Sequence, residues 1–271
     1  MTSDSIHILF IADIVGREGY EITADLLPRL RRDVAPDLVI ANGENGASGK
    51  GLTPKIAHSF FELGVDVITS GNHIWNKNKI FPMLDEHPHL LRPANYPPGN
   101  PGHGWCRIRI RNGVEAGVIN LQGRSFMTPI DCPFRTADSI LDLFEQEGVR
   151  VVVVDFHAEA TAEKIALGRY LDGRVSAVLG THTHVQTADE TVLPGGAGYI
   201  TDVGMTGPRH SVIGMDASVA VERFVTQTPK NYKIGEGDPV LSAVRLKCDT
   251  RSGKTLEIER LLLDTQTSNG S

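Results

Sequence analysis

Five short apolar runs, rich in Val and Ile, recur along the chain and limit the folds it can adopt. Their length and β-branched content predict buried strands, at residues 6–12, 38–41, 65–69, 151–156 and 175–179. Amphipathic stretches between them predict helices, at residues 20–33, 53–63, 80–86, 136–147 and 163–171. Strands that alternate with helices in this way predict parallel β-α units.

Two turn signals interrupt this alternation. Asn112-Gly113 predicts a hairpin between residues 107–111 and 115–121. Ser252-Gly253 predicts another, between residues 241–248 and 255–263. Because antiparallel strands add to the parallel units, we expect an α/β fold in which layered sheets of mixed strands are flanked by helices.

Neither a repeat nor a linker divides the 271 residues. We therefore expect a single domain over residues 1–271, with a frayed polar tail at residues 265–271. The first apolar run contains a histidine and lacks a basic leader, so we expect no signal peptide. No run approaches the roughly 20 apolar residues of a membrane helix. These features predict a cytoplasmic protein without a membrane anchor.

Charge and cysteine content exclude several classes of protein. The 33 acidic and 27 basic residues give a formal net charge of −6. Sequence-independent binding to polynucleotides needs Lys and Arg to neutralise phosphates, so this total argues against it, although a local basic patch remains compatible. Cys106, Cys132 and Cys248 are odd in number and far apart. They predict neither a disulfide framework nor a thiolate zinc site.

Each predicted strand leads directly into side chains that can bind metals. In open α/β sheets, ligands gather beyond the carboxyl ends of the strands, so five strand ends would deliver these side chains to one place. The residues are Asp13, Glu44, Asn45, Asn72, His73, His157, His182 and His184.

A structural explanation exists for most of these residues taken singly. Asp13 fits a helix cap, Glu44 fits a turn in a glycine-rich loop, and His157 fits a hydrogen-bonded core histidine. His182 and His184 point more strongly to a metal, since two histidines spaced by two can both turn toward it where a strand ends. The structural explanations do not account for the shared position of all these residues at strand ends.

The glycine-rich segment GENGASGKG, at residues 43–51, resembles a phosphate-binding loop only superficially. A Walker loop has Gly-x-x-x-x-Gly-Lys followed by Ser or Thr, and this segment places Glu44 at the first glycine and Gly51 after the lysine. We interpret the glycines as residues that let the backbone turn sharply around Glu44.

Together, these motifs resemble the calcineurin-like metallophosphoesterase superfamily, and more closely its YmdB-type phosphodiesterase branch. The resemblance runs from about residue 8 to residue 215, and more thinly to the end. It departs from the superfamily pattern where Asp-x-His is replaced by Asp13-Ile14-Val15 and where the bridging Asp is replaced by Glu44. The branch shares both departures. Segments that carry the resemblance include ANGENGASGKG, GNHIWNK, VDFHAEAT and GTHTHVQTAD.

The resemblance implies a metallophosphoesterase-like sandwich of two sheets in four layers, with a dinuclear metal centre. One metal would be held by Asp13, Glu44, Asn45 and His184. Glu44 would bridge to a second metal, held also by Asn72, His157 and His182. His73 would act as the general acid.

Charge and ligand chemistry suggest how such a centre would work. Two divalent ions beside the Asp13 and Glu44 carboxylates would leave a net charge of about +2, or about +1 with a bridging hydroxide that attacks phosphorus. The leaving alkoxide needs a proton, which His73 could supply beside the metal ligand Asn72. Nitrogen and oxygen ligands without thiolate suit two divalent transition-metal ions, with Fe, Mn and Zn as the candidates.

We therefore expect a phosphodiesterase that hydrolyses cyclic nucleotides, 2′,3′-cyclic and also 3′,5′-cyclic. The alternatives are a phosphomonoesterase or nucleotidase on the same centre, and a metal-dependent nucleotide sensor with incidental turnover. His73 favours turnover, because a sensor needs no proton donor. Partners would be small phosphate esters, short RNA, and in a homo-oligomer a second copy of the chain. Loop residues that could contact substrate or simply pack are Arg124, Phe126, Tyr199 and Arg209.

Overall fold

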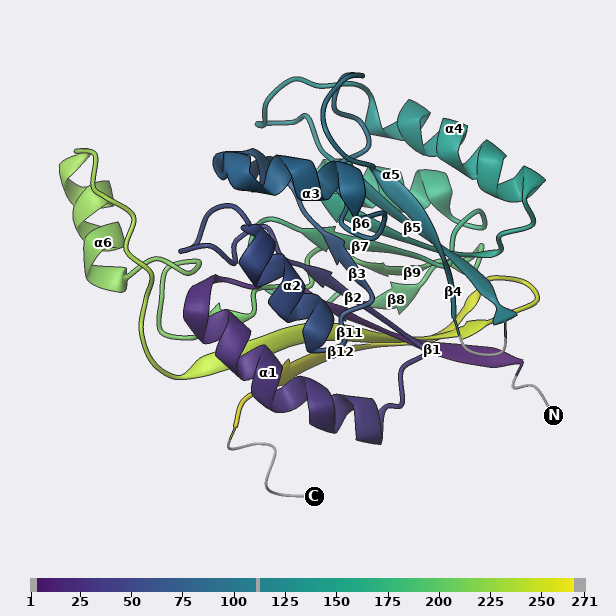
Figure 1. Ribbon diagram of the computed structural model, residues 1–271, viewed down its shortest axis with the longest axis horizontal. Coiled ribbons are helices and arrows are strands. Elements are labelled where there is room, and N and C mark those ends of the chain that lie inside the picture. Colours follow the sequence, from purple (N-terminus) through teal and green to yellow (C-terminus); the bar gives the residue numbers. More distant parts are fainter. Residues whose placement is uncertain (1–3, 111–112, 266–271) are drawn as a thin grey trace.

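Two β-sheets packed face to face form the centre of the structure, a computed structural model that describes residues 4–110 and 113–265 (Figure 1). The first sheet has the order β10-β11-β1-β2-β3, with β12 paired to β11, and the second has the order β4-β5-β6-β7-β9-β8. The first contains β1 (Ser5–Ile11), β2 (Leu38–Asn42), β3 (Val67–Thr69), β10 (Gly207–Pro208), β11 (Pro239–Asp249) and β12 (Thr255–Leu263). The second contains β4 (Trp105–Arg109), β5 (Glu115–Gln122), β6 (Val151–His157), β7 (Ala177–Thr181), β8 (Thr191–Val192) and β9 (Gly198–Ile200).

Helices cover the outer faces of both sheets. The first sheet is covered by α1 (Gly16–Asp33), α2 (Pro54–Glu62) and α3 (Phe81–Glu86), and the second by α4 (Pro133–Gln146) and α5 (Thr161–Leu171). The resulting four layers confirm the predicted sandwich. A further helix, α6 (Ala217–Thr226), projects from one side (Figure 1). Among the described residues, no helix is both long and apolar enough to cross a bilayer.

The alternation of side chains along the strands explains the layers. In β1, Ile8 and Phe10 pack between the two sheets, whereas Leu9 and Ile11 pack against the helices outside the first sheet. The central strands are therefore apolar on both faces, as is typical of parallel strands covered on both sides. Such strands have continuous apolar sequences, and this explains why they could be predicted.

The five predicted central strands correspond to β1, β2, β3, β6 and β7, which lie in two parallel groups, with β5 joining the second. The five predicted helices are also observed, and the Thr53 hydroxyl caps α2 by accepting the Ile56 N–H at 3.4 Å. That residues 1–271 form a single domain stays a prediction.

Both predicted hairpins are present, as the antiparallel pairs β4–β5 and β11–β12. Gly113 has a φ of 77°, as expected at a turn glycine, while Asn112 lies outside the described residues. The predicted frayed tail also lies outside them, apart from Thr265. The sequence patterns did not predict α6 or the short strands β8, β9 and β10.

Candidate metal centre

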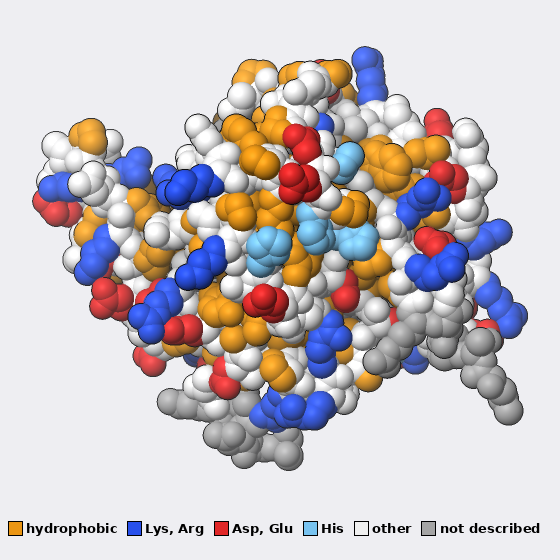
Figure 2. All heavy atoms as spheres, in the orientation of Figure 1, with side chains coloured by type: hydrophobic (Ala, Val, Ile, Leu, Met, Phe, Trp, Pro, Cys, Tyr) orange, Lys and Arg blue, Asp and Glu red, His pale blue; other side chains and the backbone are white. Residues whose placement is uncertain are grey.

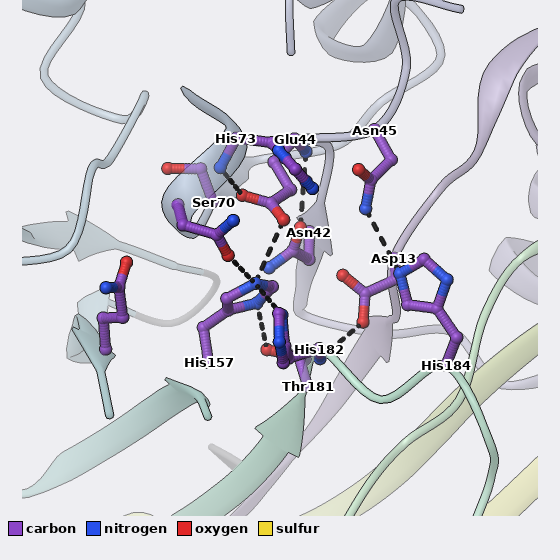
Figure 3. Close-up of polar contacts among 12 residues, drawn as sticks. Asp13, Asn42, Glu44, Asn45, Ser70, His73, His157, Thr181, His182 and His184 are labelled. Atoms are coloured by element: carbon purple, nitrogen blue, oxygen red, sulfur yellow. Dashed lines mark hydrogen bonds and ion pairs between the residues drawn. The ribbon is translucent and has the colours of Figure 1, made fainter. Parts of the chain in front are cut away.

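The carboxyl ends of strands from both sheets meet at one end of the sandwich. β1, β2 and β3 arrive from one sheet, and β6 and β7 from the other, so that residues far apart in sequence become neighbours (Figure 3). Ligand atoms of Asp13, Glu44 and His157 all lie within 4.8 Å of one another, and all three side chains are buried. The structure gathers here Asp13, Glu44, Asn45, Asn72, His73, His157, His182 and His184.

Nε2 of His157 is the meeting point of one half of the cluster. It lies 3.0 Å from Oε1 of Glu44, 3.2 Å from Oδ1 of Asn72 and 3.0 Å from Nδ1 of His182. These four donor atoms come from the ends of four strands (Figure 3). They belong to the set of residues that the family resemblance assigns to one metal ion.

The other half of the cluster contains Asp13, Asn45 and His184. The side-chain nitrogen of Asn45 lies 3.3 Å from Nε2 of His184. Nδ1 of His184 lies 3.0 Å from the carbonyl oxygen of Ile213, so its N–H donates there and Nε2 keeps its lone pair for the cluster. Oδ2 of Asp13 accepts the backbone N–H of His182 at 3.0 Å and so connects the two halves.

Unusual backbone conformations direct these side chains inward. Asp13, His182 and His184 have φ values of 30°, 98° and 66°, in the left-handed region that residues other than glycine seldom adopt. A buried ion pair holds residues 182–184 in this shape. Asp202 accepts a hydrogen bond from the Thr183 N–H at 3.0 Å and another from Nζ of Lys164 at 2.7 Å. Strained residues of this kind persist only where surrounding contacts enforce them, and they cluster at functional sites.

Gly71 lets the third strand end reach the cluster. A Cβ atom at this position would lie 2.0 Å from the ring of His157, so no larger residue fits. Beyond Gly71 the chain enters a 3-10 helix, η1 (Asn72–Asn76). There Asn72 turns toward His157, while the backbone N–H of His73 donates to Oε2 of Glu44 at 2.8 Å. The 3-10 turn thus separates the directions of two side chains that are adjacent in sequence.

The electrostatics of the cluster favour positive charge. Burial raises the pKa of Asp13 well above its usual range, and the Asp202 and Glu44 carboxylates add to the rise. Burial also opposes ionisation of Glu44, but His157 beside it lowers the pKa of Glu44 to about 2. The carboxylates in turn outweigh burial at His157 and raise its pKa to about 9. Burial and the charge of His157 lower the pKa of His182 to about 3.

Two buried carboxylate oxygens test whether a metal would fit. Oδ1 of Asp13 and Oε1 of Glu44 are inaccessible to solvent and accept no hydrogen bond from the described residues, although Oε1 forms an ion pair with Nε2 of His157 at 3.0 Å. Buried polar atoms without partners are rare and need an explanation, and a buried carboxylate needs a compensating cation. The surrounding donors are imidazole nitrogens and amide groups without thiolate, a set that suits divalent transition metals. The residues present therefore fit metal ions.

Asp155 is a supporting residue that the sequence analysis missed. Its Oδ1 accepts the hydroxyl hydrogen of Thr181 at 2.7 Å, and the Thr181 oxygen lies 2.9 Å from Nδ1 of His157. Thr181 therefore accepts the Nδ1–H of His157, so that Nε2 is the nitrogen that faces the cluster and would bind a metal. A signal was available in the sequence, because Asp155 interrupts an apolar strand two residues before His157 and so lies on the same face.

Asn120 was missed as well, and it joins the two sheets beside the centre. Its side chain accepts the N–H of Ser70 at 2.9 Å and donates to the Ser70 carbonyl at 2.8 Å. Asn120 lies in β5 of the second sheet, whereas Ser70 directly follows β3 of the first. This pair of hydrogen bonds therefore positions the Gly71-Asn72 turn relative to His157.

A cavity of about 340 Å³ opens over the cluster, with the three histidines His73, His182 and His184 on its floor. Glu159 also faces it, with Oε2 at 3.1 Å from Nε2 of His182. Its outer wall contains cationic, aromatic and aliphatic side chains that the sequence did not indicate, including Lys50, Ile213, Arg223, Phe224 and Tyr232.

None of the four loop residues proposed from the sequence as substrate contacts lines this cavity. Tyr199 is buried beside α5, with its hydroxyl 3.0 Å from Oγ1 of Thr201. Arg209 instead pairs with Asp264 at 2.7 Å. Phe126 is 92% exposed, and Arg124 lies near Cys132. Tyr199 therefore packs inside the molecule, whereas Phe126 lies at its surface.

Known proteins resemble this chain along most of its length. A family model described as YmdB-like protein matches residues 9–261. A Bacillus subtilis strain 168 protein named 2′,3′-cyclic-nucleotide 2′-phosphodiesterase is 49% identical over 261 residues, which cover 96% of this chain and 97% of that protein.

Solved structures agree with this assignment. A crystal structure described as a novel phosphatase from Mycoplasma pneumoniae has a TM-score of 0.90 at 32% identity, covering 96% of this chain and 94% of that one. The 5′-nucleotidase precursor from Thermus thermophilus has a TM-score of 0.61 at 13% identity, covering 96% of this chain and 54% of that one. The second likeness shows a shared fold.

Proposed function

Because the chain belongs to the YmdB-like protein family and is a phosphoric ester hydrolase, we propose that it is a two-metal phosphodiesterase that hydrolyses 2′,3′-cyclic nucleotides. One observation carries the proposal. Nε2 of His157 lies within 3.2 Å of donor atoms from Glu44, Asn72 and His182, while Oδ1 of Asp13 remains buried without a hydrogen bond. Donor atoms gathered in this way from five strand ends are what a dinuclear site requires.

The ligand sets follow from the two halves of the cluster. Asp13, Glu44, Asn45 and His184 would hold one ion, and Glu44, Asn72, His157 and His182 the other. When bound, two divalent transition ions such as Fe, Mn or Zn would neutralise phosphate charge and lower the pKa of bound water. The hydrogen bond from Nδ1 of His157 to Thr181 and that from Nδ1 of His184 to Ile213 hold both rings with Nε2 facing the cluster.

We assign His73 as the general acid. Its side chain lines the cavity, and its backbone N–H holds Oε2 of Glu44. Nδ1 of His73 lies 2.9 Å from Oδ1 of Asn76, which accepts its N–H and orients the ring. With Nδ1–H held by Asn76, the doubly protonated ring would carry its second proton on Nε2 and could give it to the leaving ribose oxygen. No described contact places His73 in either ligand set.

The charge of the substrate supports a diester. A centre with a net charge of about +1 to +2 binds a phosphodiester anion without a large excess of opposite charge. In the reaction, a water oxygen bonds to phosphorus and the bond to one ribose oxygen breaks, giving a phosphomonoester and a free hydroxyl. The name of the Bacillus relative supports 2′,3′-cyclic nucleotides as substrates, and we extend the proposal to 3′,5′-cyclic nucleotides as slower ones.

Elemental analysis tests the metal proposal. Protein purified without chelator is expected to hold about two transition-metal ions per chain, because the cluster offers two ligand sets. His182→Ala removes one ligand and should lower the metal content. The matched control is His210→Ala, since His210 is exposed and outside the cluster. Metal-free protein that Mn, Fe and Zn all fail to activate would refute the proposal.

A substrate panel tests the reaction itself. Hydrolysis of 2′,3′-cyclic nucleotides is expected to be faster than that of nucleoside monophosphates and simple monoesters. The Mycoplasma pneumoniae structure is described as a phosphatase, so monoesters are the informative competitors. A preference of about tenfold or more for monoesters, equal to about 1.4 kcal/mol in the barrier, would favour a phosphomonoesterase instead.

A further inference from the structure

A second, larger cavity lies beside the metal centre, and its lining carries more cations than carboxylates. Its volume is about 1380 Å³, and its walls come from the starts of α1 and α2, the glycine-rich loop, and residues 76–79 and 232–236. Five cationic side chains line it against two carboxylates, in a chain whose formal net charge is −6. The cations are Arg17, Lys55, Lys77, Lys79 and Lys233, and the carboxylates are Glu18 and Glu236.

Three of these five cations have no carboxylate partner among the described residues. Within the described part of the chain, Lys55, Lys77 and Lys79 form no ion pair. Lys233 forms ion pairs with Asp216 and Glu236, both at 3.7 Å, and Arg17 pairs with Glu21 at 2.6 Å on the exposed surface of α1. Unpaired cations around a concave wall concentrate field lines and raise the local concentration of anions.

The basic cavity and the metal cavity are neighbours that share a wall. Tyr232 lines both, and the loop between them contributes Ser48 to one and Lys50 to the other. Asn76, which orients His73, also lines the basic cavity. Figure 2 shows Lys and Arg side chains on this face, between the central histidines and the projecting part of the molecule.

Tyr232 gives this passage an aromatic surface. Its ring lies 5.3 Å from Nζ of Lys50, and the side chain is partly buried. Aromatic rings next to cations are the common arrangement for single-stranded nucleic acids, because bases stack on the rings while phosphates contact the cations. The volumes of the two cavities also suit a nucleic acid strand. The metal cavity, at about 340 Å³, is at the small end of ligand pockets, whereas the basic cavity, at about 1380 Å³, is larger than a small-molecule site.

We propose that the substrate is an oligonucleotide ending in a 2′,3′-cyclic phosphate, with its terminal nucleotide at the metal centre and its upstream phosphates in the basic cavity. The proposal rests on the proposed function and names its substrate class. Water adds to the terminal phosphorus, and one phosphorus–ribose oxygen bond breaks. The released oxygen takes a proton, and the oligonucleotide leaves with a terminal phosphomonoester.

Charge-neutral variants of the basic cavity test this inference. The Lys55→Gln/Lys79→Gln double variant removes two cations remote from the metal cluster, and Lys247→Gln/Lys254→Gln is the matched control outside both cavities. The two substrates are adenosine 2′,3′-cyclic phosphate and a triadenylate with the same terminus. The wild type should show about tenfold higher kcat/KM for the triadenylate, as two phosphate contacts would give.

The cavity variant should lose that preference while keeping its rate on the mononucleotide, and the control should keep both. For the triadenylate, kcat/KM of the cavity variant should also depend less on salt than that of the wild type. The slope of log kcat/KM against log salt concentration should fall by about 1.4. Equal kcat/KM of the wild type for both substrates would overturn the inference and leave the proposed function standing.

Failure of the wild type to hydrolyse either substrate would refute the proposed function, and a binding assay then decides the inference separately. The probe is a 5′-fluorescent triadenylate with a 3′-phosphate, followed by anisotropy. Weaker binding by Lys55→Gln/Lys79→Gln than by the control supports the basic cavity as an oligonucleotide site. Equal binding by the two variants rejects it.

Discussion

The floor and the rim of the metal cavity differ in burial and in the segments of the chain that form them. The floor rests on Asp13, Glu44 and His157, which are each no more than 1% exposed and come from the ends of strands in two sheets. Most of the rim is one excursion of the chain between β10 and β11, joined by Lys50 from the glycine-rich loop. There α6 exposes 70% of Phe224 and 77% of Val225 to solvent.

This difference separates rigid parts of the site from adaptable ones. The contact between Glu44 and His157 joins residues 113 positions apart, and both side chains have further partners that restrict them. α6 buries only Ala220 among its side chains, and its N-terminus is held by Asp216, which accepts the Val219 N–H at 3.1 Å. A helix with so little buried apolar area opens at low free-energy cost. We infer that the floor determines the chemistry and the rim determines which ligand is accepted.

The largest effect is expected from removing His73, the proposed proton donor on the floor. His73→Ala should lower kcat by about 10²–10⁴-fold on a substrate with an alkoxide leaving group. Both metals and substrate binding should be kept, because His73 belongs to neither proposed ligand set. Steady-state kinetics with elemental analysis of the same sample measures this.

The leaving group provides the control for this prediction. p-Nitrophenolate departs without a proton, so the loss should shrink on p-nitrophenyl esters. Equal losses on alkyl and p-nitrophenyl esters, with metals retained, would remove His73 from the role of general acid. Loss of metal on mutation would instead make it a ligand.

An intermediate effect is expected from Asp155, which supports the floor without facing the cavity. Asp155→Asn weakens the acceptor for the Thr181 hydroxyl, which then holds Nδ1 of His157 less firmly. Changes of this kind lower metal affinity by about 10–100-fold. Competition with a chelator measures the affinity, and Asp138→Asn on exposed α4 is the control. Unchanged affinity in Asp155→Asn, with an unchanged Tm, would show that Thr181 alone orients the ring.

The same contrast explains what the sequence could predict. Floor residues follow apolar runs whose ends are visible in the sequence, and parallel strands bring those ends to one edge. Asp155 was visible as a break in an apolar strand, but its supporting role was not, because its partners, Thr69 and Thr181, come from other strands. Tyr199 was a candidate contact because it lies in a family-like motif, but its strand turns that side chain toward α5.

The rim and the basic cavity could not be predicted for a related reason. Residues 217–226 form a helix whose apolar side chains mostly face solvent, so no burial pattern marks it. The cations of the basic cavity come from four separate segments. Composition reports only the net charge of the whole chain, which is negative. Surfaces assembled from distant segments depend on the tertiary fold and have no periodicity of their own.

The smallest effect is expected at the rim, from Phe224→Ala. This side chain lines the metal cavity and is positioned to stack on a nucleobase, an interaction worth about 1–3 kcal/mol. KM for the 2′,3′-cyclic nucleotide should therefore rise about tenfold, with kcat and metal content little changed. Because Phe224 is 70% exposed, its loss should leave Tm unchanged. Val225→Ala is the control, since Val225 is adjacent, exposed and outside the cavity. Equal KM for both variants would show that the base lies elsewhere, and a fall in kcat at constant KM would place Phe224 with the chemistry of the floor.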